Sequence, residues 1–226
     1  MNVAALIFDF DGLILETETP IFEEWSAVYR RHGHLLGLDL WQHSIGTKGG
    51  FDPCAHLMAL TGEALDREAL EREVHERFWR RCEEQTLLPG VEAVLRDARR
   101  LGLGTAVATS SGSGWAAGWL ERHGIRGHFD VLCVREDVPR VKPAPDLFLL
   151  AAERLGVRPD ACVVFEDSPN GIHAAHAAGM RCVAVPNNVT RSLPLPDPDL
   201  VLGSLAELPL AAILARLEVA KPLAAS

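Results

Sequence analysis

From residue 90 onward, short apolar runs alternate with helical patterns, and this alternation limits the possible folds more than any other feature of the chain. Short, continuous apolar runs are typical of strands buried on both faces of a parallel sheet. The predicted strands span 3–8, 103–108, 131–134, 162–165, 182–185 and 200–202. The predicted helices span 91–101, 115–123, 147–155 and 172–178, and they end at Gly102, Gly124, Gly156 and Gly179, which suit a left-handed C-terminal cap. The pattern predicts an α/β fold with a mostly parallel sheet.

The alternation of predicted strands and helices is interrupted once, between the first strand and the second. From Asp11 to Thr109 the chain runs for 98 positions, whereas a strand–helix–strand unit takes about 30 residues. Apolar residues in this interval recur at helical spacing, as at Ile21, Trp25 and Val28, with no strand pattern between. We therefore expect a small helical domain over 17–85, inserted into a sheet domain made of 1–16 and 86–226.

Polar side chains follow the ends of the predicted strands. They are Asp9, Asp11, Thr109, Ser110, Lys142, Glu166 and Asp167. In an open parallel sheet the carboxyl ends of the strands meet at one crevice, so these groups should converge there. Clustered carboxylates repel one another unless a cation lies among them, and oxygen ligands of this kind suit Mg²⁺.

The remaining groups of this set suit a phosphate. The Thr109 hydroxyl, nearby backbone N–H groups and Lys142 can bind phosphate oxygens. Asp9 could attack phosphorus, while Asp11, two residues further on, supplies and later removes a proton. The residues by themselves thus predict phosphoryl transfer.

Four segments resemble the motifs of the haloacid dehalogenase superfamily, in the right order and over most of the chain. They are Asp9-Phe10-Asp11-Gly12-Leu13, the hydroxyl at Thr109, Val141-Lys142-Pro143-Ala144-Pro145-Asp146 and Phe165-Glu166-Asp167-Ser168-Pro169-Asn170-Gly171-Ile172. The stretch 171–180 is similar to the phosphatase and β-phosphoglucomutase-like branch. The resemblance implies a Rossmann-like core with an inserted helical cap.

The resemblance also assigns roles to these residues. It implies Asp9 as nucleophile, Asp11 as general acid and base, and a phosphate site made by Thr109, the Ser110 amide and Lys142. It implies Mg²⁺ held by Asp9, the Asp11 carbonyl and Asp167, with Glu166 nearby.

The branch is chosen on two positions. Asp11 argues against dehalogenases and phosphonatases, which lack this second aspartate. The mutases of the family carry a histidine in the first cap helix, where this chain has Ile21. The sequence therefore favours a phosphatase acting on a small phosphorylated metabolite, such as a sugar phosphate, with a β-phosphoglucomutase-like mutase as the alternative.

The segment 46–50 is the candidate for substrate choice. Thr47 and Lys48 lie there among glycines, where cap loops of the family reach over the site, and a solvated lysine is the alternative for Lys48.

A second alternative concerns 112–117, which matches GxGxxA and outlines a dinucleotide fingerprint. Its third glycine is absent, and a phosphate-binding helix start explains the glycines equally well. Trp115 and Trp119 in this region are predicted to pack a helix.

Composition limits the classes of binding partner and the cellular locations that the protein can have. The 226 residues carry a formal net charge of −9, which argues against a general nucleic-acid binder. No apolar run is long enough for a membrane span, and no secretory signal is visible. The five cysteines show no CxxC spacing, which indicates reduced thiols and a cytoplasmic protein. A monomer and a small homo-oligomer are both compatible with the sequence.

Overall fold

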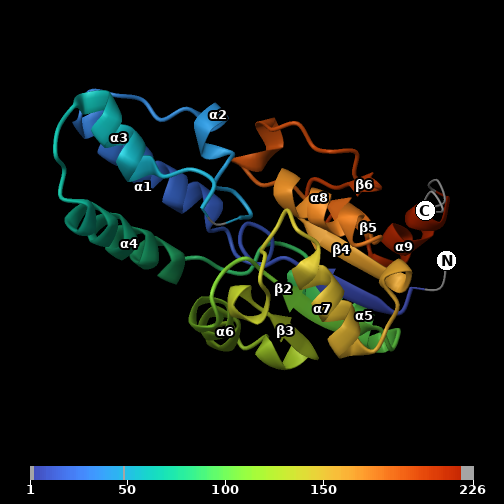
Figure 1. Cartoon of the computed structure of the whole chain (residues 1–226). Coiled ribbons are helices and arrows are strands. Elements are labelled where there is room, and N and C mark those ends of the chain that lie inside the picture. The colour runs from blue at the N-terminus through green and yellow to red at the C-terminus, as the bar shows by residue number, and fades with distance from the viewer. Residues whose placement is uncertain (1–2, 48, 220–226) are drawn as a thin grey trace.

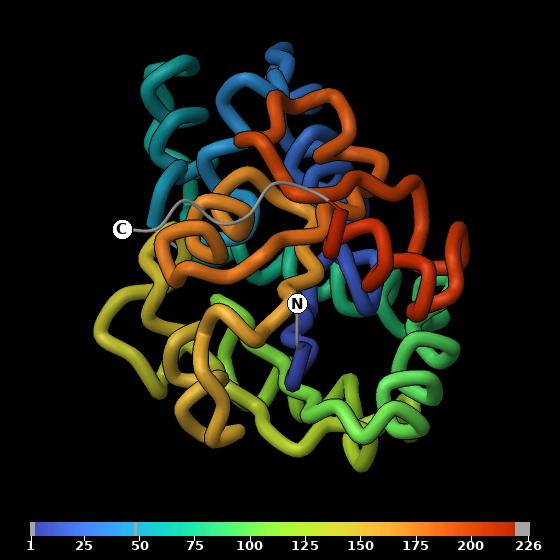
Figure 2. Tube along the Cα trace, turned by 90° about the vertical axis from the view of Figure 1, so that its right-hand side faces the viewer, coloured from blue at the N-terminus to red at the C-terminus, as the bar shows by residue number. Residues whose placement is uncertain are grey.

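A computed structural model describes residues 3–47 and 49–219 and contains a six-stranded parallel sheet (Figure 1). The strands are β1 (Ala5–Phe8), β2 (Gly104–Ala108), β3 (Val131–Cys133), β4 (Cys162–Glu166), β5 (Arg181–Ala184) and β6 (Leu200–Val201). Their spatial order is β3-β2-β1-β4-β5-β6, and every pair is parallel. In Figure 2 the blue first strand lies between the green and yellow segments on one side and the orange and red segments on the other. The predicted α/β class is confirmed.

Helices cover both faces of this sheet. They are α5 (Val91–Arg100), α6 (Ser113–Arg122), α7 (Asp146–Leu155), α8 (Pro169–Ala177) and α9 (Leu210–Val219). Short 3-10 turns occur at Arg126–His128, Arg135–Asp137, Pro159–Ala161 and Thr190–Ser192. Leu6 and Phe8 of β1 pack in one core with α5, α6 and α9, whereas Ala5 and Ile7 pack in a second core with α7 and α8. The alternation of side chains along a strand thus gives the first strand two buried faces.

The four predicted glycine caps have positive φ angles between 67° and 70°. Helix α8 begins three residues earlier than the apolar pattern indicates. The reason is local, because the Ser168 hydroxyl accepts a hydrogen bond from the Gly171 amide and Pro169 occupies the first turn.

Four helices lie between β1 and α5, on one side of the sheet domain (Figure 1). They are α1 (Glu18–Arg31), α2 (Leu38–Trp41), α3 (Pro53–Thr61) and α4 (Arg67–Glu83). They share a separate apolar cluster that includes Trp25, Tyr29, Leu57 and Val74. The predicted boundaries of this insertion, 17 and 85, stay a prediction.

The described residues contain no helix that is both long enough and apolar enough to cross a membrane. All five cysteines are buried free thiols.

Candidate active site

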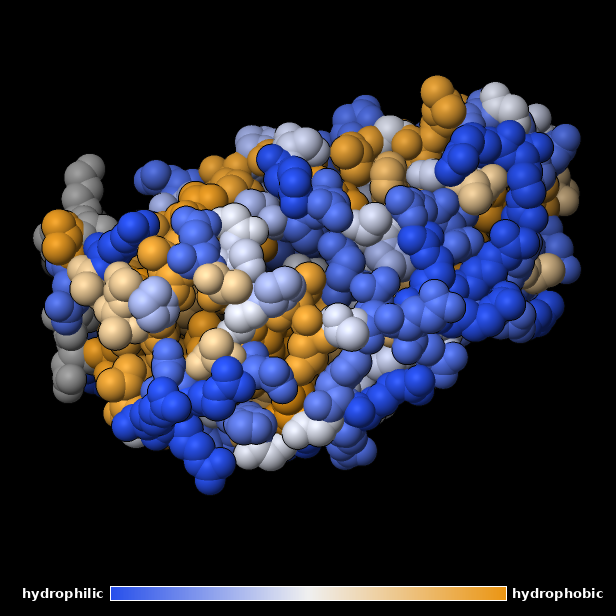
Figure 3. Space-filling view, turned by 180° about the vertical axis from the view of Figure 1, so that it is seen from behind, coloured by the Kyte–Doolittle hydropathy of each residue, from blue (hydrophilic) through white to orange (hydrophobic). Residues whose placement is uncertain are grey.

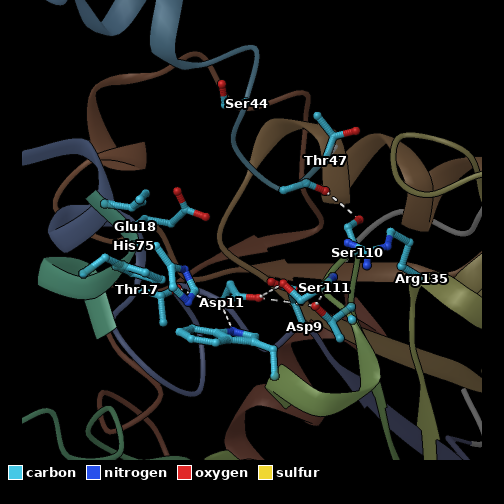
Figure 4. A pocket seen from close by; sticks show the side chains of 16 residues that line it. Asp9, Asp11, Thr17, Glu18, Ser44, Thr47, His75, Ser110, Ser111 and Arg135 are labelled. Atoms are coloured by element: carbon cyan, nitrogen blue, oxygen red, sulfur yellow. Dashed lines mark hydrogen bonds between the residues drawn. The ribbon is translucent and has the colours of Figure 1, made fainter. Parts of the chain in front are cut away.

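A cavity of about 420 Å³ lies where the carboxyl ends of the strands face the inserted helices (Figure 4). The sheet domain contributes residues that follow β1, β2 and β3, and the insertion contributes residues of α1, α4 and the loop before α3. The lining residues are Asp9, Asp11, Thr17, Glu18, Ile21, Ser44, Gly46, Thr47, His75, Phe78, Thr109, Ser110, Ser111, Gly112, Trp115 and Arg135. The cavity is therefore built from both parts of the chain.

A buried ion-pair triad lies at the base of the site. Lys142 is fully buried, and its Nζ donates hydrogen bonds to Asp9 Oδ1 at 2.5 Å and to Glu166 Oε1 at 2.7 Å. Burial alone would lower the pKa of Lys142. The charges of Asp9 and Glu166 raise this pKa by more than burial lowers it, so the net pKa lies above the usual range. Lys142 thus stays a cation that holds Asp9 in place.

Glu166 is fixed from several directions. Its second oxygen, Oε2, accepts hydrogen bonds from the Asp167 amide and from the Ser168 amide and hydroxyl. Gly171 lies so close that a Cβ there would approach Glu166 Oε1 to 1.7 Å. Both oxygens of Glu166 therefore have protein partners, and its contacts organise the loop after β4.

The site is suited to a divalent cation. Asp9, Glu166 and Asp167 each offer an oxygen, and these atoms lie within 4.8 Å of one another. Asp167 Oδ1 is buried without a hydrogen-bond partner, which costs free energy unless a ligand binds there. Burial raises the pKa of Asp167 well above its usual range, and the charges of Glu166 and Asp9 add to this rise. Hard oxygen donors of this kind fit Mg²⁺.

Asp9 shows the same electrostatic situation. Burial raises its pKa to about 7, because lost hydration and the charges of Glu166 and Asp11 outweigh the attraction of Lys142. A divalent cation beside Asp9 would favour the ionised carboxylate, which is the form that can attack phosphorus.

The other Asp167 oxygen, Oδ2, accepts a hydrogen bond of 2.7 Å from Asn187 Nδ2. Sequence reasoning missed Asn187. It follows β5, so the rule that directed attention to the ends of the other strands would have found it too.

Asp11 accepts hydrogen bonds from four side chains. Trp115 Nε1 and Thr17 Oγ1 donate to Oδ1 at 2.8 and 2.9 Å. Ser111 Oγ and Thr109 Oγ1 donate to Oδ2 at 2.6 and 3.4 Å. The sequence identified only Thr109 among these donors, and the expectation that Trp115 merely packs a helix missed its polar contact.

The predicted substrate-binding residues lie on both sides of the cavity. Ser110 Oγ donates to the Gly46 carbonyl at 2.9 Å, and this bond joins the loop after β2 to the loop that contains Thr47 (Figure 4). Thr47 lines the cavity, whereas Lys48 lies outside the described residues. Asp9, Asp11, Thr109, Ser110 and Thr47 thus share one cavity, with Lys142, Glu166 and Asp167 grouped around Asp9.

A parallel sheet with acidic residues at its strand ends and a helical insertion after β1 defines the class as a Rossmann-like α/β protein with a helical cap. Comparison with known proteins identifies the family, because the model of the haloacid dehalogenase-like hydrolases matches residues 3–179. The chain belongs to this family, as its sequence motifs predict.

Individual relatives agree with this assignment. The chain is 47% identical to "Putative phosphatase YhcW" of Bacillus subtilis, over 94% of this chain and 96% of that protein. It is 40% identical to the fructose-1-phosphate phosphatase YqaB of Escherichia coli, over 80% and 96% of the two chains. Among solved structures, CbbY from Rhodobacter sphaeroides in complex with phosphate has a TM-score of 0.72 at 30% identity, over 92% and 98%.

Proposed function

We propose that this protein is a Mg²⁺-dependent phosphatase that hydrolyses a small phosphorylated carbohydrate through an aspartyl-phosphate on Asp9. The observation that carries the proposal is the buried triad in which Lys142 orients Asp9 beside a carboxylate oxygen, Asp167 Oδ1, that lacks a partner. The proposal also includes the cytoplasmic location, and a monomer or small homo-oligomer as the assembly.

The coarser part of this function rests on the family. The family match and the names of the relatives show a hydrolase of the phosphomonoesterase type. The name of the relative YqaB also supports the carbohydrate part of the substrate, since that protein is a fructose-1-phosphate phosphatase.

In the proposed mechanism, Asp9 attacks the phosphorus atom, and the bond between phosphorus and the sugar oxygen breaks. Asp11 gives a proton to the departing oxygen and then takes one from the water that hydrolyses the aspartyl-phosphate. Lys142 keeps Asp9 oriented and offsets negative charge, while Thr109 and the Ser110 amide bind phosphoryl oxygens.

Asp9, the Asp11 carbonyl and Asp167 would hold Mg²⁺, with Glu166 nearby. When bound, the ion supplies positive charge that offsets the charges of the carboxylates and of the phosphoryl oxygens.

We assign substrate choice to the cap, which comprises 17–85. Thr47 lines the cavity opposite the residues that follow the strands, and His75 of α4 lines it as well. These groups can contact the variable part of a substrate, whereas the groups around Asp9 contact the common phosphate. Lys48 is assigned to the same role on the sequence alone.

The proposal is tested by incubating the protein with a panel of phosphorylated sugars and hexitols and measuring released phosphate, with Mg²⁺ and with excess chelator. We expect release from at least one compound with Mg²⁺ and loss of release with chelator. Release from none of the panel contradicts the phosphatase proposal, and full activity in chelator contradicts the metal assignment. A Thr47→Val variant should change the rank order of the substrates, while a uniform loss would argue against substrate contact.

A mutase remains the second candidate, because one feature of the cavity favours it. Ile21 lines the cavity where a mutase of the family carries histidine, but His75 provides an imidazole from α4. With β-glucose 1-phosphate and a catalytic amount of the bisphosphate, a mutase would form glucose 6-phosphate without releasing phosphate. That outcome, abolished by His75→Ala, would replace the phosphatase by the mutase.

A further inference from the structure

The two carboxylate oxygens of Asp11 are held by different parts of the molecule. Oδ2 accepts hydrogen bonds from Ser111 and Thr109, which both follow β2 in the sheet domain. Oδ1 accepts hydrogen bonds from Thr17 and Trp115. Thr17 immediately precedes α1, the first inserted helix, so this donor is attached directly to the insertion.

Trp115 belongs to α6 of the sheet domain, but its ring packs against the inserted helix α4. It stacks on Phe78 with ring centroids 5.2 Å apart and an interplanar angle of 21°, and it meets Trp79 edge-on at 5.3 Å. Trp119, one turn further along α6, contacts Trp79 at 5.4 Å and Trp115 at 5.5 Å. We call these four residues the α4–α6 aromatic cluster. The cluster joins the insertion to the sheet domain beside the cavity.

Within this cluster, the two indole groups of α6 differ in their polar contacts. Trp115 Nε1 donates to Asp11 Oδ1, whereas Trp119 Nε1 is buried without a hydrogen-bond partner. Trp115 is therefore the member whose N–H connects the cluster to the site, and Trp119 is a natural control for its aromatic packing.

We propose that Trp115 is a positioning residue that couples the place of α4 to the orientation of Asp11. The inference rests on the proposed function, in which Asp11 exchanges a proton with the leaving sugar oxygen and later with water. A carboxylate oxygen has about two acceptor positions, and both positions of Oδ1 are filled by Trp115 and Thr17. One donor has to move before Oδ1 can reach substrate or water.

Both donors to Oδ1 depend on the inserted helices, Thr17 through the chain and Trp115 through its stacking on Phe78. A shift of α4 moves the indole ring and with it the N–H that holds Asp11. The donors to Oδ2, Ser111 and Thr109, are not members of the α4–α6 aromatic cluster, so a shift of α4 does not reach them through it. Asp11 thus turns about a fixed contact when α4 moves, so that the position of the cap determines when the proton can be transferred.

The first test compares Trp115→Phe with Trp119→Phe, since both variants keep an aromatic ring and lose an indole N–H. With fructose 1-phosphate and Mg²⁺, Trp115→Phe should lower kcat about tenfold and leave KM within about twofold, which corresponds to about 1.4 kcal/mol of transition-state stabilisation. Trp119→Phe should leave both parameters close to those of the unaltered protein. Equal kinetic parameters in the two variants would overturn the proposal.

The second test separates the two chemical steps. With p-nitrophenyl phosphate the leaving group needs no proton, so Trp115→Phe should keep the initial burst of p-nitrophenolate and slow the steady state. Phe78→Leu, which keeps the indole N–H but removes the stacked ring of α4, should lower kcat in the same direction. An unchanged kcat in Phe78→Leu would show that α4 has no influence on Asp11.

A third measurement does not need turnover. The indole N–H of Trp115, assigned by its loss in Trp115→Phe, should exchange slowly with solvent in NMR spectra. Phe78→Leu and Asp11→Asn should each speed this exchange at least tenfold. Unchanged exchange in both variants overturns the coupling. Absence of phosphate release from every compound by the unaltered protein would instead contradict the proposed function, and the exchange rates would still decide the coupling.

Discussion

The same chemical group, a carboxylate, is buried in the crevice and more exposed on the inserted helices. The Asp9 side chain is 4% exposed and the Asp52 side chain, which caps α3, is 51% exposed. Burial raises the pKa of Asp9 and of Asp167. For Asp52, loss of hydration is the largest single influence and raises the pKa, but the Ala55 amide and Arg67 together outweigh it, so the net pKa is lowered. Hydrogen bonding to Arg31 likewise lowers the pKa of Glu73.

This difference separates groups that serve chemistry from groups that serve stability. A buried carboxylate without a full set of partners costs folding free energy, and the cost is offset only when a cation or substrate binds. Exposed carboxylates at helix starts and in ion pairs each contribute a small stabilisation. The space-filling view from behind agrees with this division, because the end that contains α1 to α4 is largely hydrophilic (Figure 3).

The largest expected effect concerns Asp9. Asp9→Asn should abolish turnover, because an amide cannot form the aspartyl-phosphate. Asp52→Asn, the matched change in the insertion, should keep turnover and the helix cap, since Asn caps helices as well as Asp. Phosphate release and thermal melting of both variants measure the comparison. Near-native turnover in Asp9→Asn would remove the covalent mechanism.

The next effect concerns Asp11. Asp11→Asn should lower turnover by about 10²–10⁴-fold, because general acid and base catalysis is lost. It should retain some phosphorylation by p-nitrophenyl phosphate, whose leaving group needs no proton, and then stall. Mass spectrometry of the intact protein should show the accumulated phosphorylated form. If no adduct accumulates and steady-state turnover is unaffected, Asp11 has no part in proton transfer.

The pKa directions predict opposite pH dependences for the two regions. The folded-state pKa of Asp9 is raised to about 7 from 3.8, so its contribution to stability is complete below about pH 4 and is lost as the pH rises through about 7. The lowered pKa values of Asp52 and Glu73 give contributions that are present above their unfolded-state values and are lost as the pH falls through the folded-state values.

Mg²⁺ should therefore stabilise the protein more at pH 8 than at pH 5, because it replaces protons at Asp9 and Asp167. Melting temperatures with Mg²⁺ and with chelator, at both pH values, measure this difference. The difference in Mg²⁺-induced stabilisation between the two pH values should be on the order of a few kcal/mol at most. Asp167→Asn serves as the control and should reduce the Mg²⁺-induced shift. An equal shift at both pH values would show that these carboxyls do not bind the ion.

The smallest effect belongs to the surface of the insertion. Arg31 and Glu73 join α1 to α4 through two hydrogen bonds of 2.8 and 3.0 Å, and their side chains are 46% and 31% exposed. Glu73→Gln should cost about 0.2–1 kcal/mol of unfolding free energy, as is usual for exposed pairs, and should leave kcat unchanged. Chemical denaturation measures the cost. A loss above about 2 kcal/mol of unfolding free energy would contradict the inference that exposed ion pairs of the insertion contribute little to stability.

Much of the site was accessible from the sequence because its residues follow strands. Asp9, Thr109 and Glu166 come directly after short apolar runs, and a parallel sheet brings such positions to one edge. Asn187 follows β5 in the same manner, and the rule would have located it. Ser111 is also next to a predicted site residue, but nothing local distinguishes its hydroxyl from that of Ser110.

Trp115 and Thr17 were not accessible in this way. Trp115 lies 104 positions from Asp11, and its position in α6 is equally compatible with a residue that only packs. Its contact with Asp11 depends on how α4 and α6 pack. Ser110 presents a similar case, because its hydroxyl bonds to a carbonyl of the insertion, 64 positions away.

Local sequence patterns by themselves determined the succession of strands and helices along the chain from residue 90 onward, the glycine caps and the set of acidic residues at the strand ends. Backbone geometry and side-chain periodicity act over a few residues, so they can be followed along the chain. Tertiary structure alone decided which hydroxyls and which indole hold Asp11, that Asp167 keeps one oxygen without a partner, and that His75 reaches the cavity. These features depend on the packing of the insertion against the sheet domain, and contacts between distant segments leave no periodic trace in the sequence.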